Sequence, residues 1–360
     1  MKIFDYSALS HREWDREVIN YIGTIHEFKG RQDFFLSGNV AKLDKLVEIA
    51  KIQSTEASNA IEGIVTTRSR FTQLMAGKTT PRNRDEKEIK GYRYVLDIIH
   101  ENFEYIPLLP NYILQLHKNL FQFSDVGFGG RFKDRQNQIV TVYPDGTREV
   151  IFSPLDVTMA PEAVEKICRE YDKATHEGGI DPLIAIPVFI HDFLCIHPFN
   201  DGNGRLSRLL TTLLLYRAGY SVGKFISLEQ KIQATKDDYY DSLRASSRAW
   251  GENANNELPF VKYLLGVILS AYRDFEERVN MLGGKVSALE TVERAVASRL
   301  GKFTKGDIMA HCPEVSRASV ENSLKQMCEK GQLKREGKGK ATYYFSPRGK
   351  FEICEAIFAL

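Results

Sequence analysis

The sequence predicts a mainly α-helical protein that carries one β-hairpin in its middle and a small domain of helices and strands at its C-terminal end. Apolar residues recur at helical spacing along most of the 360-residue chain. Two short β-prone runs flank the turn sequence Pro144-Asp145-Gly146. A glycine pair at 283–284 is the clearest linker signal, and it separates the last segment from the rest.

The composition is that of an ordinary soluble globular protein. Hydrophobic residues make up 43% of the chain and charged residues 27%, and the net charge is +2. No apolar run approaches the length of about 18 residues that a membrane span needs. The first residues also lack a secretory signal, so we expect a cytoplasmic protein with no membrane partner. The five cysteines form no CxxC pair and the eight histidines no HExxH pattern, so neither a disulfide framework nor a zinc motif is predicted.

Residues 1–100 are predicted to form an N-terminal helical region, because two apolar stripes of helical spacing run through it. Within it, residues 54–63 read Ser-Thr-Glu-Ala-Ser-Asn-Ala-Ile-Glu-Gly. Ser58 and Glu62 lie four residues apart and therefore share one helical face. Gly63 is placed to end this helix as a left-handed cap. Taken alone, the segment is an ordinary helix end.

Residues 101–282 are predicted to form a second helical region, which holds the hairpin at about 138–153. The runs Ile139–Tyr143 and Val150–Phe152 supply its strands. An isolated hairpin is marginal in water, so this one should lean on a neighbouring surface. Its free edge offers backbone pairing to an extended peptide, and a purely structural surface hairpin is the alternative.

Residues 197–208 are the most informative segment and read His-Pro-Phe-Asn-Asp-Gly-Asn-Gly-Arg-Leu-Ser-Arg. An apolar helix predicted over residues 182–193 leads into them, and leucines at helical spacing follow. Polar and glycine residues that open a helix make an anion site, because free backbone N–H groups and the positive end of the helix dipole face outward. Arg205 and Arg208, three residues apart, add positive charge to the same helical face.

Two further residues of this segment indicate chemistry on a bound anion. Asp201 would repel a phosphate unless a cation lay between them, so it predicts Mg²⁺ bridging the protein and a polyphosphate. His197 is able to accept a proton from an attacking hydroxyl near neutral pH. The combination suits transfer of a phosphorus group from a nucleotide to an alcohol. A simple turn with surface arginines and a core histidine is the structural alternative.

Residues 197–208 match the motif HxFx(D/E)GNGRxxR at every specified position, and the chain thereby resembles the Fic family. Fic proteins are α-helical, and most of them transfer AMP from ATP to a hydroxyl group of a protein. The resemblance implies that His197 is the general base and that Asp201 holds Mg²⁺. It implies that Arg205 and Arg208 clamp the β- and γ-phosphates. The α- and β-phosphates would be cradled by Gly202, Asn203 and Gly204.

The resemblance also gives the N-terminal helix a function. The inhibitory helix of the family follows the pattern (S/T)xxxE(G/N), which is matched by Ser58, Glu62 and Gly63. When this helix precedes the core, its glutamate pairs with the second arginine of the motif, here Arg208. The implied pair takes the place of the γ-phosphate, which predicts autoinhibition.

Two other segments resemble parts of the Fic active site. The hairpin is similar to the Fic flap, which holds the backbone of the target protein beside the bound nucleotide. Aromatic residues that follow the core often line the adenine pocket in this family, and Tyr239 and Tyr240 occupy that position. Packing of these two tyrosines in the core is an equally weighted alternative.

Residues 285–360 are predicted to form a separate winged-helix domain, in which three helices precede two strands around a basic glycine turn. Between residues 301 and 350 there are 11 lysines and arginines against 5 acidic residues, a local net charge of +6. This excess fits a surface that faces nucleic acid. Protein contact or dimerisation is an equally weighted use. The predicted recognition helix would present Arg317, Ser319, Asn322 and Lys325.

Two functions from different classes stay open. The first is a protein adenylyltransferase that uses ATP and Mg²⁺ and is held inactive by Glu62. Its partners would be a protein hydroxyl docked on the flap, the chain itself in automodification, and a second copy in a homodimer. The second is a DNA-binding winged-helix regulator whose Fic domain senses nucleotide. The intact motif favours the enzyme, because a sensor needs neither His197 nor Asp201. Within the enzyme class, another donor and the removal of AMP both stay open.

Overall fold

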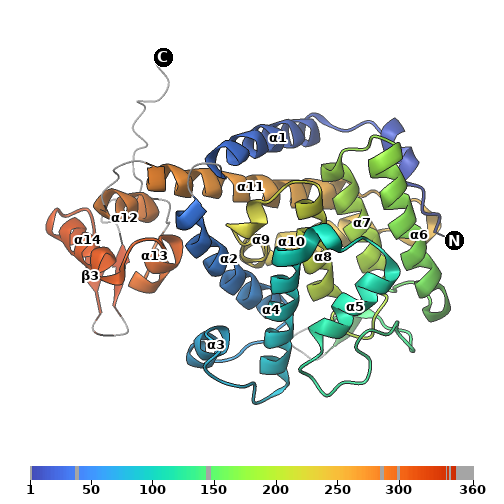
Figure 1. The fold of residues 1–360 in the computed structure, drawn as a ribbon, viewed down its shortest axis with the longest axis horizontal. Coiled ribbons are helices and arrows are strands. Elements are labelled where there is room, and N and C mark those ends of the chain that lie inside the picture. Colours follow the sequence, from blue (N-terminus) through green and yellow to red (C-terminus); the bar gives the residue numbers. More distant parts are fainter. Residues whose placement is uncertain are drawn as a thin grey trace. The chain divides into compact units, whose positions relative to one another are not determined.

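The computed structural model describes residues 2–36, 40–142, 147–283, 288–297, 301–337, 339 and 342–345. The protein is mainly helical, as the sequence predicts, and its described strands form two small antiparallel sheets (Figure 1). The chain divides into two compact units. The larger unit holds the residues up to Phe275 except 44–46, and the smaller unit holds 44–46 together with Glu276 onward.

Eleven α-helices and one hairpin begin in the larger unit. The helices are α1 (Arg16–Leu36), α2 (Val40–Ile61), α3 (Arg68–Met75), α4 (Arg84–Asn102), α5 (Pro110–Leu120), α6 (Ala160–Asp172), α7 (Pro182–Ile196), α8 (Asn203–Arg217), α9 (Leu228–Ala234), α10 (Lys236–Ser247) and α11 (Leu258–Gly283). The hairpin consists of β1 (Ile139–Val142) and β2 (Arg148–Phe152). The smaller unit contains α12 (Ala288–Ala297), α13 (Lys305–His311), α14 (Arg317–Glu329), β3 (Lys334–Glu336) and β4 (Tyr343–Phe345).

The centre of the larger unit is the pair α7 and α8. Helix α7 is apolar on every side and nearly all of its residues are buried, which is the position that such a helix requires. It packs against α6, α8 and α10, while α4 and α5 also pack against α8. On another side of the unit, Phe28 of α1 stacks on Tyr272 of α11 with 6.1 Å between the ring centroids. The connection between α7 and α8 is therefore held at both ends by buried helices.

Two residues in left-handed conformations bound this connection. His197 has φ of 50° and ends α7, and its N–H donates to the carbonyl of Phe193 at 2.9 Å. Gly202 has φ of 80° and precedes α8. A Cβ at position 202 would lie 2.8 Å from Cε2 of Phe121, so the position requires glycine for both conformation and space. The chain thus reverses sharply and aims the N-terminus of α8 at the region beside His197.

The C-terminal end of α2 is closed by a left-handed glycine, as predicted. Gly63 has φ of 77° and donates to the carbonyl of Ala60, while Ile64 donates to the carbonyl of Asn59. This pair of bonds is the Schellman motif. The Nζ atom of Lys236, from α10, donates to the carbonyl of Ile61 at 2.7 Å and satisfies a further group at this helix end. Glu62 is thereby fixed at the tip of α2.

The strands β1 and β2 pair antiparallel, with Val140 opposite Val150 and an irregularity after Ile139. The ring of Phe152 meets that of Trp250 edge to face at 6.3 Å, so the hairpin rests on the helical body as expected. The predicted turn at 144–146 lies outside the described residues.

The two compact units do not coincide with the three predicted regions, and the predicted division at 1–100, 101–282 and 285–360 stays a prediction. Most of residues 1–100 lie in the same unit as residues 101–275, and α2 and α4 are bonded to other helices of that unit. Tyr92 of α4 donates to Glu229 of α9 at 3.0 Å, and Ser54 of α2 donates to Ser227 at 2.9 Å. The boundary before the C-terminal unit falls after Phe275, within α11, and not at the glycine pair.

The smaller unit has its own apolar core, which includes Val292, Ile308, Val320, Leu324 and Leu333. Thr304 and Asp307 form a capping box at the start of α13, and Ser316 caps α14 as predicted. Strands β3 and β4 pair antiparallel. Three helices followed by two strands is the order expected for a winged helix, and that assignment stays a prediction.

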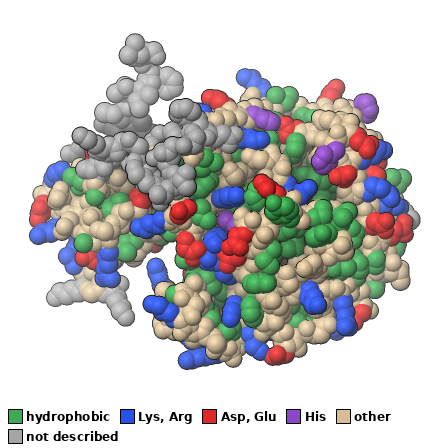
Figure 2. All heavy atoms as spheres, viewed as in Figure 1, with side chains coloured by type: hydrophobic (Ala, Val, Ile, Leu, Met, Phe, Trp, Pro, Cys, Tyr) green, Lys and Arg blue, Asp and Glu red, His purple; other side chains and the backbone are tan. Residues whose placement is uncertain are grey.

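Figure 2 shows acidic and basic side chains mixed over the visible face of the larger unit, with no large area of one sign. This distribution agrees with the near-neutral net charge of the sequence. Across the part of the chain that the structure describes, none of the helices combines the length and the apolar character needed to span a bilayer.

We expect Gly91→Ala to destabilise the larger unit by about 2 kcal/mol or more, because overpacking of a tight helix contact has this cost. A Cβ at Gly91 of α4 would collide with the backbone carbonyl of Leu120 at the end of α5. The measurement is the free energy of unfolding from urea denaturation followed by circular dichroism. Gly23→Ala is the matched control, since a Cβ there meets nothing within 4 Å. Equal unfolding free energies for the two variants would contradict the close approach of α4 and α5.

Candidate active site

The connection between α7 and α8, residues 197–202, is shaped by its own side chains. The side chain of Asn203 is buried, and its amide bonds Phe199 at both ends. The N–H of Phe199 donates to Oδ1 of Asn203 at 3.0 Å, and Nδ2 of Asn203 donates to the carbonyl of Phe199 at 2.8 Å. The N–H of Gly202 donates to Oδ1 of Asp201 at 2.6 Å. The side chain of Asn203 is therefore used to hold the loop at residues 197–202. The backbone N–H of Asn203 is the group of this residue that would be able to bind an anion.

His197 is held in the tautomer that a general base needs. Its Nδ1 lies 3.3 Å from the carbonyl of Leu194, which places the proton on Nδ1 and leaves Nε2 as the acceptor. Burial lowers the pKa of His197 to about 4, with a further contribution from the charge of Lys133. The carboxylates of Glu62 and Asp201 act in the opposite direction. The imidazole is therefore neutral at pH 7 and able to accept a proton.

Glu62 and Arg208 form the ion pair that the sequence resemblance implies. The Nη2 of Arg208 lies 2.8 Å from Oε1 of Glu62. The same arginine donates from Nε to Oγ of Ser58 at 2.8 Å and from Nη2 to the carbonyl of Ser58 at 2.9 Å. Burial opposes ionisation of Glu62, but the guanidinium of Arg208 outweighs it and holds the pKa of this carboxyl below its ordinary value. Arg208 is itself buried and needs a counter-charge, which the carboxylate of Glu62 at the end of α2 supplies.

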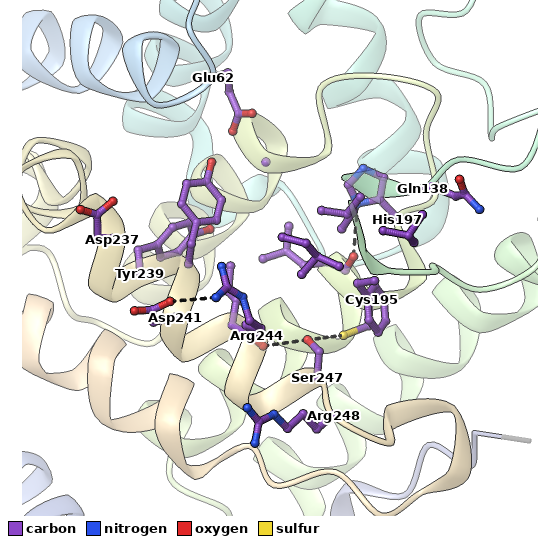
Figure 3. A pocket seen from close by; sticks show the side chains of 18 of the residues that line it. Glu62, Gln138, Cys195, His197, Asp237, Tyr239, Asp241, Arg244, Ser247 and Arg248 are labelled. Atoms are coloured by element: carbon purple, nitrogen blue, oxygen red, sulfur yellow. Dashed lines mark hydrogen bonds and ion pairs between the residues drawn. The ribbon is translucent and has the colours of Figure 1, made fainter. Parts of the chain in front are cut away.

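The carboxylate of Glu62 also lies against the first turn of α8. A Cβ at Gly204 would collide with Oε1 of Glu62. A side chain at position 204 would therefore require the carboxylate of Glu62 to move. In Figure 3, Glu62, Tyr239 and His197 lie around the same end of the pocket.

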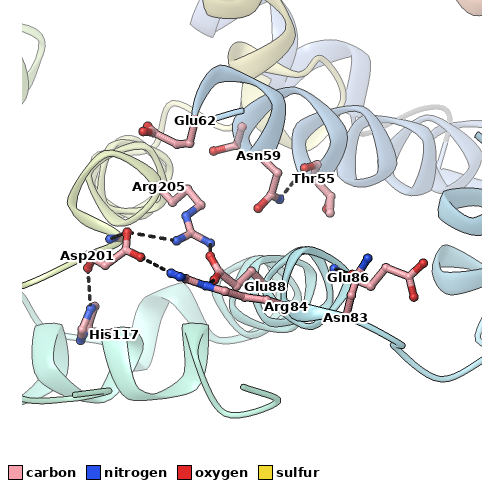
Figure 4. Close-up of polar contacts among 12 residues, drawn as sticks. Thr55, Asn59, Glu62, Asn83, Arg84, Glu86, Glu88, His117, Asp201 and Arg205 are labelled. Carbon is pink, nitrogen blue, oxygen red and sulfur yellow. Dashed lines mark hydrogen bonds and ion pairs between the residues drawn. The ribbon is translucent and has the colours of Figure 1, made fainter. Parts of the chain in front are cut away.

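Arg205 lies in a buried network that the sequence analysis did not foresee. Its side chain is 1% exposed, and Nη1 lies 2.6 Å from Oε2 of Glu88, which is 2% exposed. Nη2 of Arg205 lies 3.6 Å from Oδ1 of Asp201. Arg84 bonds Glu88 and also donates to Oδ2 of Asp201 at 2.6 Å (Figure 4). Arg205, which was predicted to clamp a phosphate, therefore has its guanidinium between the carboxylates of Glu88 and Asp201.

Arg84 and Glu88 were missed because their sequence signal is weak. They stand four residues apart on α4, a spacing typical of a solvated helix face. Nothing in this spacing indicates that Arg84 reaches Asp201, which lies 117 residues further along the chain. It does not indicate either that Glu88 pairs with Arg205.

His117 is another residue that sequence reasoning passed over. The N–H of Gly130 donates to its Nδ1 at 3.0 Å, so Nε2 carries the proton and donates to the carbonyl of Asp201 at 3.0 Å. Its ring stacks on Phe199 with 3.8 Å between centroids. Burial lowers the pKa of His117 to about 4, which keeps the ring neutral. His117, on α5, therefore supports the connection at residues 197–202.

A pocket of about 1290 Å³ opens beside these residues (Figure 3). The tip of α2, the start of α8, the hairpin and α10 line it. Tyr239 is buried and Tyr240 is 38% exposed, and their ring centroids lie 5.3 Å apart. Tyr239 also packs against Phe260, so it contributes both to the core and to the pocket wall. The lining residues at the end near α2 and α8 are Glu62, His197, Gly204 and Arg208, and those of the hairpin and the residue before it are Gln138, Ile139, Val150, Ile151 and Phe152.

The carboxylate of Asp201, in the connection at residues 197–202, is suited to a metal ion that binds together with a polyphosphate. Within the described ranges, no group of three or more histidine, cysteine or acidic residues is arranged to hold a metal ion. Asp201 stands at the loop as a carboxylate that is 40% exposed. One carboxylate, phosphate oxygens and waters together satisfy the octahedron of Mg²⁺. The residues present are therefore compatible with Mg²⁺ bound together with a nucleotide.

Comparison with known proteins identifies the domain that carries this site. Residues 107–215 match the Fic/DOC family. The chain is 28% identical over 131 residues to a Fido domain-containing protein of Dictyostelium discoideum, an alignment that covers 35% of this chain and 87% of that protein. It is 28% identical over 206 residues to the protein adenylyltransferase Fic of Drosophila melanogaster, covering 55% of this chain and 37% of the fly protein. It thus spans well under half the length of that fly relative.

Solved structures share the fold. A Fic family protein from Desulfovibrio desulfuricans superposes with a TM-score of 0.61 at 21% identity, covering 95% of this chain and 98% of that one. A Fic domain containing signaling protein from Bacteroides thetaiotaomicron gives a TM-score of 0.61 at 22% identity, covering 71% of this chain and 97% of the other. Residues 107–215, which contain the hairpin and the loop from His197 to Arg208, are therefore a Fic/DOC family domain, with Fic protein adenylyltransferases among its relatives.

Proposed function

We propose that this protein is an adenylyltransferase that moves AMP from ATP to a Ser, Thr or Tyr hydroxyl of a protein. One observation carries the proposal: a neutral histidine and the N-terminal turn of α8 line the same pocket, together with residues of the hairpin. Relatives named as Fic protein adenylyltransferases support the same reaction class.

The phosphates of ATP would lie at the N-terminus of α8. The backbone N–H groups of Asn203 and Gly204, in the first turn of α8, would donate to these phosphates, because the helix dipole favours negative charge there. The N–H of Gly202 already donates to Oδ1 of Asp201. Arg208 would hold the terminal phosphate once Glu62 releases it. Arg205 is buried between two carboxylates, so it acts through the loop by fixing Asp201. Asp201 would hold Mg²⁺, which supplies neutralisation of phosphate charge when bound with the nucleotide.

His197 would remove the proton from the target hydroxyl. The Nε2 atom accepts the proton as the hydroxyl oxygen bonds the α-phosphorus. The bond from the α-phosphorus to the bridging oxygen breaks, and diphosphate leaves with the electron pair. The target keeps AMP as a phosphodiester. The hairpin edge would align the target by backbone pairing, so that its hydroxyl reaches the loop.

Glu62 would keep the protein inactive. Its carboxylate occupies the guanidinium of Arg208 and lies against Gly204, where it would repel the γ-phosphate. The pair can break only if another anion replaces Glu62, because Arg208 is buried and needs a counter-charge.

A role in DNA binding has weaker support. On the predicted recognition helix α14, Glu321 pairs with Arg317 at 3.1 Å and also with Lys305 of α13. Glu329 lies 3.8 Å from Lys325. These carboxylates offset the positive charge that DNA would require.

We expect Glu62→Gly to raise AMP transfer about 10- to 100-fold, a range usual for the coupling free energy of a regulatory contact. The substitution frees Arg208 for the γ-phosphate. The measurement is incorporation of label from ATP labelled on the α-phosphate, with Mg²⁺. Glu56→Gly is the matched control, because Glu56 lies on the exposed side of the same helix. Equal rates for wild type and Glu62→Gly would remove the autoinhibition proposal, and label from the γ-phosphate alone would replace AMP transfer by phosphate transfer.

In the Glu62→Gly background, His197→Ala is expected to reduce label incorporation by about 100-fold or more, the usual contribution of a general base. ATP affinity measured by calorimetry should stay within about twofold of the parent, because the base acts on the hydroxyl and not on the phosphates. The exposed His176, changed to alanine, serves as the control. Full activity of the His197 variant would assign proton removal to another group.

The rate of AMP transfer should be flat between about pH 5.5 and 7.5, because a general base with a pKa near 4 is already deprotonated there. Burial lowers the pKa of His197, so the active neutral form persists down to acidic pH and is lost only near pH 4. The measurement is the pH dependence of single-turnover label transfer in the Glu62→Gly variant. A rise in rate centred near the ordinary histidine pKa would show that the base is solvated during catalysis.

A further inference from the structure

Lys133 is a buried cation that lies between α5 and β1 and that the proposed reaction does not use. Its side chain is 3% exposed. The Nζ atom donates to Oδ1 of Asn137 at 3.1 Å, to the carbonyl of Leu155 at 2.6 Å and to the carbonyl of Ile196 at 3.2 Å. The backbone N–H of Lys133 donates to the carbonyl of Pro198 at 2.8 Å.

The surroundings match the donor capacity of an ammonium group. A lysine has three side-chain donors, and each of them finds an oxygen here. Removing a charge from water has a high cost, so a lysine in this position is retained only when its bonds are satisfied. Burial lowers the pKa of Lys133 to about 8, while the carboxylate of Asp156 acts in the opposite direction.

The acceptors belong to two parts of the site. Ile196 and Pro198 are the residues directly before and after His197, so Lys133 is bonded on both sides of the proposed base. Asn137 precedes β1, and Leu155 follows β2. The ammonium therefore joins both ends of the hairpin to the loop that carries His197.

Neighbouring bonds reinforce this junction. Nδ2 of Asn137 donates to the carbonyl of Phe199 at 3.0 Å, and the N–H of Leu155 donates to the carbonyl of Cys195 at 3.2 Å. Nε2 of Gln136 donates to the carbonyl of Pro154 at 2.8 Å across the base of the hairpin. These bonds join both ends of the hairpin to α7 and the connection that follows it, beside the contacts of Lys133.

We propose that Lys133 is a positioning residue, which holds the base of the hairpin and the His197 loop in one arrangement so that a hydroxyl docked on the hairpin meets Nε2 of His197. The inference rests on the proposed function for its catalytic consequence. Its structural part, that the hairpin depends on Lys133, stands independently of which reaction the protein performs.

The physical reason lies in what remains when the ammonium is removed. The carbonyls of Leu155 and Ile196 and the amide oxygen of Asn137 lose the ammonium as a donor, the carbonyl of Ile196 in a buried position. A two-stranded hairpin has little stability of its own. The hairpin would then move relative to the loop, while the anion site at α8 would keep its backbone bonds. A misplacement of about 1 Å between reacting groups reduces a rate by about 100-fold.

The test compares Lys133→Met with its parent, the full chain carrying Glu62→Gly. Methionine has nearly the length of lysine and removes the charge and the donors. Arg135→Met is the matched control, because this cation belongs to the same segment, is 81% exposed and pairs with its neighbour Asp134. Asn137→Ala is the second variant, in case the methionine variant does not fold. It keeps the lysine and removes one acceptor of the ammonium together with the bond from Asn137 to Phe199.

Three quantities are measured: the rate of AMP transfer from α-labelled ATP, the affinity for Mg²⁺–ATP by calorimetry, and amide hydrogen exchange in β1 and β2. We expect Lys133→Met to lower the rate about 100-fold, with nucleotide affinity within about twofold and faster exchange in both strands. Asn137→Ala should change all three in the same directions by less, and Arg135→Met should match the parent.

The pH profile separates positioning from a passive structural role. In the parent, the rate should fall above about pH 8 as Lys133 loses its proton, and this fall should be absent in Lys133→Met. The charged or titratable groups that act on this ammonium and its loop are Asp156 and His197. His197 is already neutral in this range, so it does not contribute to the fall.

Several results would overturn the inference. Hairpin exchange and transfer rate both unchanged in Lys133→Met would show that the ammonium holds nothing in place. A loss of nucleotide affinity as large as the loss of rate would make Lys133 part of the nucleotide site. If the Glu62→Gly parent transfers no label at all, the proposed function fails. The comparison of hydrogen exchange in β1 and β2 between the parent and Lys133→Met then tests whether Lys133 holds the hairpin in place.

Discussion

The buried guanidinium of Arg208 is the group on which the rest of the structure depends. It lies inside the larger unit, where an unpaired charge would be strongly destabilising, and its partners Ser58 and Glu62 come from a helix about 150 residues earlier in the chain. The hydrogen bonds and the ion pair of Arg208 join α2 to α8, so that segments far apart in the sequence belong to one compact unit. It also places a carboxylate where a nucleotide would need a free cation, so stability of the resting fold and availability of the phosphate site oppose each other.

Charge in the rest of the site is balanced within the protein in the same way. Arg205 and Arg84 share the carboxylates of Glu88 and Asp201, which leaves the loop between α7 and α8 close to neutral before any ligand binds. Histidines near the loop are kept neutral by burial and not by partners. In the proposed reaction, backbone N–H groups and the helix dipole would therefore supply the attraction for a phosphate, and the neutral His197 would be able to accept a proton.

The two ends of the pocket depend on different kinds of contact. At the end near α8, an ion pair joins α2 to α8, and the proposed function requires a phosphate to replace its carboxylate. At the hairpin end, Lys133 is bonded to backbone carbonyls that no ligand replaces. The first arrangement suits regulation and the second suits fixed geometry. This difference would allow the proposed enzyme to combine inhibition by Glu62 with a fixed arrangement of His197 and the hairpin.

The sequence by itself determined the features that depend on neighbouring residues. The motif from His197 to Arg208, the cap at Gly63, the cap at Ser316 and the hairpin strands were predicted because their geometry is set within a few residues of chain. Tertiary structure alone decided that Glu88 binds Arg205, that Arg84 reaches Asp201, that Lys133 joins the hairpin to the His197 loop, and that the unit boundary falls inside α11. Those contacts join segments far apart in the chain, and the spacing of residues within one segment carries no information about which distant side chain will neutralise a buried charge.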